Sequence, residues 1–90
     1  MPIIRWKVSK RMNNNIFLEE AKKCVEQTTN EVLAEEMYIV WFCKTLQNWK
    51  ALISTDVLNG FYWEVTHNGD KNETYVDTYT KSSNLCIKGE

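Results

Sequence analysis

The sequence predicts an α+β domain in which an N-terminal helix packs on an antiparallel meander sheet of about four strands. Apolar residues recur at helical spacing between about Ile16 and Thr28. The stretch from Met37 to Thr55 is the densest in β-branched and aromatic residues. Two Asn-Gly pairs then mark turns between stretches of alternating polarity. A helix on one face lets so small a sheet bury one of its sides.

The length and the net charge of the chain limit the number of domains and the classes of function that are compatible with it. The chain has 90 residues, which suits one domain, and we assign residues 13–90 to it. Its 11 Lys and Arg nearly balance its 12 Asp and Glu, for a net charge of −1. A general nucleic-acid binder usually carries a positive excess. A nucleic-acid mimic would carry a large negative excess, so any electrostatic recognition must come from a local patch.

Cysteine usage and hydropathy point to the cytoplasm. Cys24, Cys43 and Cys86 are odd in number and widely spaced, which favours neither a disulfide framework nor a zinc site. We therefore expect no metal and no cofactor. The N-terminus lacks the long apolar stretch of a signal peptide, and the longest apolar run, Met37 to Cys43, is too short to span a bilayer.

Residues 1–12 precede the helical pattern and contain the most basic segment of the chain. Weak alternation within residues 3–8 is compatible with an added edge strand. The segment can equally be a flexible arm, or an extension that precedes an alternative start at Met12. After it, Asn13, Asn14 and Asn15 are candidate caps for the helix over 16–28. The helix either ends near Asn30, before a second short turn, or continues to about Glu36.

The stretch Met37 to Thr55 reads as a hairpin with its turn near Gln47 and Asn48. Because both faces of its first strand are apolar, we expect that strand at the centre of the sheet. Val40, Phe42, Ala51 and Ile53 are its expected packing residues. In this pattern Tyr38, Val40 and Phe42 share one face of the first strand, and Met37, Ile39, Trp41 and Cys43 share the other.

Two more strands follow, over about 61–66 and 73–79, separated by the Asn68-Gly69 turn pair. Phe61, Trp63 and Val65 should face the core, and their neighbours should face outward. The segment Leu85 to Ile87 is either a last short strand or a tail.

No catalytic constellation emerges from the sequence. A Cys-His dyad would have to use His67, the only histidine, and no orienting group is evident. Glu64 and Asp77 can share a sheet face, where two carboxylates can serve acid/base chemistry, but acidic residues on a solvated face usually keep a domain soluble. We expect a protein that is not an enzyme.

The outward face of the last two strands is the first candidate binding surface. Tyrosine is common at binding surfaces because its ring is rigid and its tip is polar, although tyrosines also pair across strands for stability alone. Carboxylates between the tyrosines favour a protein partner over nucleic acid, since they repel phosphate. The residues of this candidate surface are Tyr62, Glu64, Tyr75, Asp77 and Tyr79.

The turn of the first hairpin is the second candidate, because a loop can present polar contacts. Its residues are Lys44, Gln47, Asn48 and Lys50, which ordinary turn chemistry with solvated lysines also explains.

Two stretches of the sequence carry a family resemblance. They are Val40 to Thr55 (VWFCKTLQNWKALIST), and Gly60 to Glu73 (GFYWEVTHNGDKNE) with Tyr75, Asp77 and Tyr79 after it. They resemble a small family of unknown function that phages and prophages of Gram-positive bacteria encode.

The resemblance covers roughly residues 13–80 and implies a phage-borne protein in the cytoplasm of a bacterial host, with no catalytic residue to transfer. We therefore expect a phage or prophage protein-binding module that acts on a host protein, such as a defence or replication factor. The alternative is a nucleic-acid-binding accessory protein that uses the basic N-terminal segment, Lys44 and Lys50. No membrane association is expected, and a homodimer is compatible with either function because an open sheet has edge strands to pair.

Overall fold

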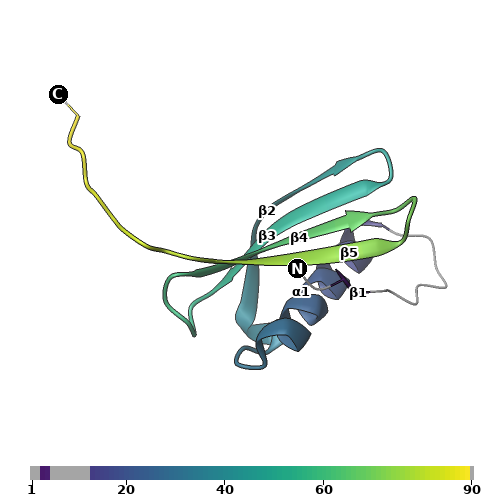
Figure 1. Ribbon diagram of the computed structural model, residues 1–90, viewed down its shortest axis with the longest axis horizontal. Coiled ribbons are helices and arrows are strands. Elements are labelled where there is room, and N and C mark those ends of the chain that lie inside the picture. The colour runs from purple at the N-terminus through teal and green to yellow at the C-terminus, as the bar shows by residue number, and fades with distance from the viewer. Residues whose placement is uncertain (1–2, 5–12, 90) are drawn as a thin grey trace.

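The computed structural model describes residues 3–4 and 13–89, in which one helix packs across one face of an antiparallel sheet (Figure 1). The sheet has five strands in the order β1-β5-β4-β3-β2, so β2 to β5 form a sequential meander. This arrangement confirms the predicted α+β class. The elements are β1 (Ile3–Ile4), α1 (Asn14–Thr29), the 3-10 helix η1 (Ala34–Glu36), β2 (Met37–Thr45), β3 (Asn48–Thr55), β4 (Phe61–Asn68) and β5 (Glu73–Thr80).

Asparagines define both ends of α1. The side chain of Asn13 accepts a hydrogen bond of 2.9 Å from the backbone N–H of Ile16, which satisfies a helix N–H that would otherwise lack a partner. Asn30 adopts the left-handed conformation with φ 59° and donates its N–H to the carbonyl of Glu26. The helix therefore stops at Thr29, and the alternative in which it runs to Glu36 is wrong.

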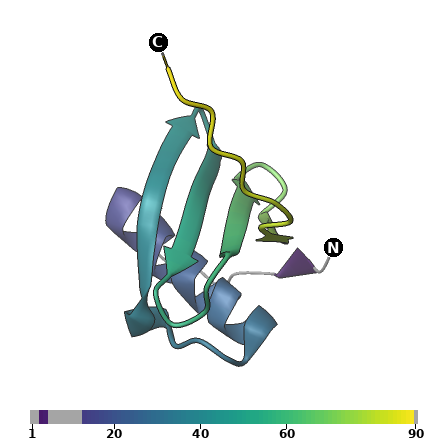
Figure 2. The ribbon, with the colours of Figure 1, turned by 90° about the vertical axis from the view of Figure 1, so that its left-hand side faces the viewer.

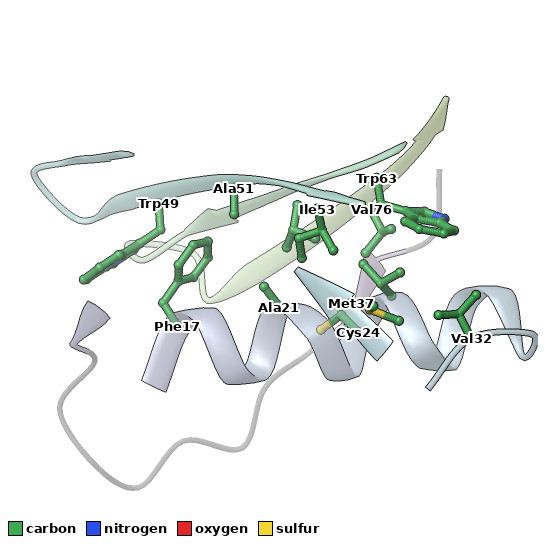
Figure 3. Close-up of a cluster of buried hydrophobic side chains, with 12 residues drawn as sticks. Phe17, Ala21, Cys24, Val32, Met37, Trp49, Ala51, Ile53, Trp63 and Val76 are labelled. Carbon is green, nitrogen blue, oxygen red and sulfur yellow. The ribbon is translucent and has the colours of Figure 1, made fainter. Parts of the chain in front are cut away.

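The core lies between α1 and the sheet (Figure 3). The helix presents a fully buried face that begins with Phe17, whose ring packs against Trp49 of β3 at a centroid distance of 5.3 Å. The sheet contributes the predicted alternate residues of β3 and β4, which confirms the two-residue period used to assign them. The buried apolar residues are Phe17, Ala21, Cys24, Val25, Val32, Met37, Trp49, Ala51, Ile53, Trp63, Val65 and Val76.

The strand β2 is an edge of the sheet and not its centre (Figure 2), so that prediction was wrong. Val40 and Phe42 were expected to pack in the core, yet they are 45% and 39% exposed. A strand with apolar residues on both faces is usually covered on both faces. In β2 only Met37, at the start of the strand, is buried, and the strand from Val40 onward is exposed.

A β-bulge at Val40 explains why the predicted faces of β2 were also wrong. Ile39 pairs with Ile53, but Trp41 pairs with the very next residue, Leu52. The extra residue reverses the alternation. Phe42 consequently follows Ile39 on the helix side of the sheet, whereas Tyr38, Trp41 and Cys43 lie on the opposite side, through their pairing with Ser54, Leu52 and Lys50.

The turn between β4 and β5 is tied to the turn between β2 and β3. The backbone N–H of Gly69 donates a hydrogen bond of 2.9 Å to the carbonyl of Gln47. A side chain at Gly69 would bring its Cβ within 2.3 Å of that carbonyl oxygen, so the close approach requires glycine. The contact holds the tip of the first hairpin in a fixed position.

Of the two ends of the chain, one contributes a strand to the sheet and the other does not. Ile3 and Ile4 pair with Tyr75 and Thr74 of β5, so the edge-strand interpretation holds for these two residues. The flexible-arm and alternative-start interpretations fall on residues outside the described part of the chain. At the other end, residues 81–89 form no strand and extend away from the sheet (Figure 1), which settles the alternatives for Leu85 to Ile87 in favour of a tail.

Candidate functional site

The sheet face opposite α1 is the candidate site, and we call it the open face. The strand register arranges its side chains in four rows that cross from β2 to β5. Because neighbouring residues that pair across strands share a face, each row is continuous. The rows are Tyr38–Ser54–Tyr62–Tyr79, Trp41–Leu52–Glu64–Asp77, Cys43–Lys50–Thr66–Tyr75 and, beside the turns, Thr45–Asn48–Asn68–Glu73.

The structure brings together the five predicted residues of the last two strands. Tyr62 pairs with Tyr79, and Glu64 pairs with Asp77. Tyr75 lies on the same side, one row further along β5. Aromatic rings therefore stand at both ends of this surface and carboxylates occupy its middle.

Charge in the middle of the open face is only partly balanced. The ammonium of Lys50 lies 3.5 Å from a carboxylate oxygen of Glu64. Asp77 stands directly across from Glu64, where like charges are unfavourable. Within the described part of the chain, the side chain of Asp77 makes no hydrogen bond or ion pair. One carboxylate of the pair is therefore left without a compensating cation.

A shallow hollow of about 360 Å³ surrounds this pair. The Tyr75 hydroxyl at its rim donates a hydrogen bond of 2.9 Å to Glu73 on the same strand, which fixes the orientation of that ring. A polar floor between aromatic rings is suited to a side chain with an apolar stem and a cationic end. The hollow is lined by Lys50, Glu64, Thr66, Tyr75 and Asp77.

The predicted polar cluster of the first hairpin is divided by the sheet. Lys50 belongs to the open face. Lys44 pairs with Trp49 and lies on the helix side, where its ammonium is 5.2 Å from the centre of the Trp49 ring. Gln47 is in the turn, and Asn48 closes it by pairing with Thr45. These four residues therefore do not form a single surface.

Three large apolar or aromatic residues of the open face were missing from the site that the sequence predicted. Tyr38, Trp41 and Leu52 add an apolar border along β2 and β3. Trp41 was assigned to the same face as Ile39, because nothing in the residue pattern reveals a bulge. One signal was available in the sequence. Leu52 is an apolar residue on the polar face of its strand, between Lys50 and Ser54, and the residues that pair with it must lie on that same face.

The remaining reactive side chains do not assemble. His67 is buried on the helix side, where its Nδ1 lies 2.8 Å from the Thr74 hydroxyl, and burial lowers the pKa of its imidazole. Cys43 lies on the open face. The sheet stands between these two residues, so they form no dyad. Among residues 3–4 and 13–89, no group of three or more His, Cys, Asp or Glu side chains is placed to hold a metal ion.

These features define a small α+β protein with one covered and one open sheet face. Within the described ranges, no helix is long and apolar enough to cross a membrane. The model of a family of unknown function, DUF6275, matches residues 6–89, and the chain belongs to this family. The match includes the C-terminal tail and part of the basic N-terminal segment. No curated protein and no solved structure matches the chain.

Proposed function

We propose that this chain is a non-enzymatic protein-binding module, encoded by a phage or prophage, that captures a host protein on its open face in the bacterial cytoplasm. A defence or replication factor of the host is the expected kind of target. The observation that carries the proposal is the composition of the open face. It combines exposed aromatic rings with a polar hollow, as protein-binding surfaces do.

The charge of the open face favours protein over nucleic acid. Lys50 is its one cation among the described residues, against the carboxylates of Glu64, Glu73 and Asp77. Phosphate groups would meet repulsion at the middle of this surface. The nucleic-acid alternative has less support, because Lys44 and Lys50 lie on opposite sides of the sheet. It still predicts salt-sensitive binding, and the absence of a mobility shift at low salt would dismiss it.

The hollow indicates the chemistry of the partner. A lysine or arginine of the partner would place its charge beside Asp77 and its stem against Tyr75. Pairing with a cation would remove the like-charge repulsion between Asp77 and Glu64. Because both carboxylates are partly exposed, the contribution of the pair is modest and the aromatic rings must supply much of the affinity.

The test is capture from a lysate of the bacterial host with the tagged chain as bait. We expect a reproducible partner that is lost when Tyr62, Tyr75 and Asp77 are replaced together by alanine. The matched control replaces three residues of the exposed helix surface, Glu19, Lys23 and Gln27, which should leave capture unchanged. Undiminished capture by the open-face variant would show that the binding surface lies elsewhere.

The single substitution Asp77→Asn sharpens this test. It keeps the size of the side chain and removes the charge that we assign to the cationic contact. We expect weaker binding that responds less to salt than binding by the wild-type chain, since screening acts on charged pairs.

The phage origin is proposed because the two stretches from Val40 to Thr55 and from Gly60 to Glu73 resemble a phage-encoded family. The genomic neighbourhood of the coding sequence tests this origin directly.

A further inference from the structure

The edge of the sheet at β2 lacks the protection that edge strands usually carry. Natural edges are short, charged, interrupted by proline or covered. The opposite edge, β1, covers two residues. The strand β2 has nine residues, no proline and a single charged residue, Lys44. Its one protective feature is the bulge at Val40, and the strand is regular from Trp41 to Thr45.

Leu46, next to this edge, is not part of the hydrophobic core. It is 76% exposed at the tip of the hairpin. Its φ of 57° lies in the left-handed region, at the first position of a two-residue turn where glycine is usual. An apolar side chain is thus held in water by a strained backbone. Strain of this kind in a fixed turn often marks a position that contacts a partner.

We infer that β2 pairs antiparallel with β2 of a second copy of the chain. The bulge sets the register, because it limits regular pairing to Trp41–Thr45. When two identical segments pair about a two-fold axis, the midpoint of the segment lies opposite itself. Cys43 of each copy therefore lies opposite Cys43 of the other, with Trp41 opposite Thr45 and Phe42 opposite Lys44.

This register makes the hairpin complementary to itself. Val40 of one copy lies opposite Leu46 of the other, so the two apolar side chains that flank the regular segment cover each other. The ammonium of Lys44 comes within reach of the Phe42 ring, which is a favourable cation–π arrangement. The large exposed apolar side chains of the hairpin beyond the bulge all acquire a neighbour. This self-complementarity selects a second copy over an unrelated strand.

Pairing at β2 would also change the shape of the open face. A two-fold axis perpendicular to the sheet keeps both helices on one side and both open faces on the other. The two sheets then form one continuous sheet with two hollows. This inference does not depend on the proposed function, because it is tested at Val40, which is not one of the residues assigned to the open face.

Sedimentation of the whole chain at increasing concentration tests the inference. We expect a dimer at micromolar concentration. Val40→Lys should weaken it about tenfold or more, because it places a charge beside Leu46 of the second copy. The matched control is Val57→Lys, at an exposed valine in the β3–β4 connection, which should leave the dimer intact. A wild-type chain that sediments as a monomer at all concentrations, or a dimer unaffected by Val40→Lys, would overturn the inference.

Disulfide trapping tests the register in a Cys86→Ser background, which removes the other exposed thiol. Under mild oxidation Cys43 should give a covalent dimer rapidly, since residues opposite each other on neighbouring strands lie within disulfide distance. Moving the thiol by one residue, with Phe42→Cys and Cys43→Ser, should slow trapping at least severalfold. Equal trapping from position 42 would refute the register. Circular dichroism of each variant verifies that it is folded.

Discussion

Replacing Leu46 should separate the cost of its backbone conformation from the role of its side chain. We compare Leu46→Gly with Leu46→Ala, because both remove the exposed leucine side chain and only glycine tolerates a φ of 57° without strain. In most regular structure glycine is less stable than alanine by about 0.5–1 kcal/mol. At this position we expect the opposite order.

The magnitude follows from two opposing terms. A left-handed backbone costs an L-residue roughly 1–2 kcal/mol, which glycine avoids. Glycine gives back about 0.5–1 kcal/mol, since it loses more conformational entropy on folding. With both terms near the middle of their ranges, the glycine variant should be more stable than the alanine variant by about 0.5–1 kcal/mol. For a domain of this size that difference corresponds to roughly 2–8 °C in Tm.

Urea unfolding followed by tryptophan fluorescence measures this difference, at a concentration where the chain is monomeric by sedimentation. Gln47 supplies the control, because it lies in the same turn without a positive φ. Gln47→Gly should be less stable than Gln47→Ala. An alanine variant at position 46 as stable as the glycine variant would refute the assignment of strain to Leu46.

Three further predictions concern stability. Because burial lowers the pKa of His67 below its ordinary value of 6.5, the unfolded chain takes up protons more readily than the folded one. Stability should therefore be fullest above about pH 6.5 and fall as the pH drops towards the lowered pKa, and His67→Gln should flatten that part of the profile measured by urea titration. Gly69→Ala should destabilise the domain by about 1 kcal/mol or more, since it breaks a backbone hydrogen bond between the two turns. Gly89→Ala is the control, because Gly89 has open space around it, and this variant should leave the Tm in thermal melts unchanged. Ile53→Val should cost about 0.5–1.5 kcal/mol because Ile53 is fully buried, and Ile87→Val in the exposed tail should cost almost nothing; equal effects would contradict the core assignment.

The sequence was sufficient to predict those elements in which apolar residues recur with one clear period. Phe17, Ala21, Cys24 and Val25 recur at helical spacing and form the buried face of α1. Strict alternation in β4 placed Tyr62 and Glu64 on the open face. In both cases the pattern follows from a one-sided environment, because each element has a core side and a solvent side.

Strand position could not be predicted in the same way. Apolar residues on both faces of β2 indicated a central strand, but they lie at an edge, where burial does not explain them. The bulge at Val40 was also invisible, since it depends on the register with Ile53 and Leu52 and not on any residue type at position 40. For this reason Tyr38 and Trp41 were absent from the predicted site.

The position of β2 also sets a hierarchy of local opening within the domain. Met37 is the one buried apolar residue of β2, whereas β3 and β4 together contribute five. The distal part of β2 can consequently separate from β3 without exposing the core, so its amide hydrogens should exchange with solvent well before those of β3 and β4. A partner strand that pairs with β2 would suppress this local separation. Slower exchange of the β2 amide hydrogens would then show that the edge is occupied.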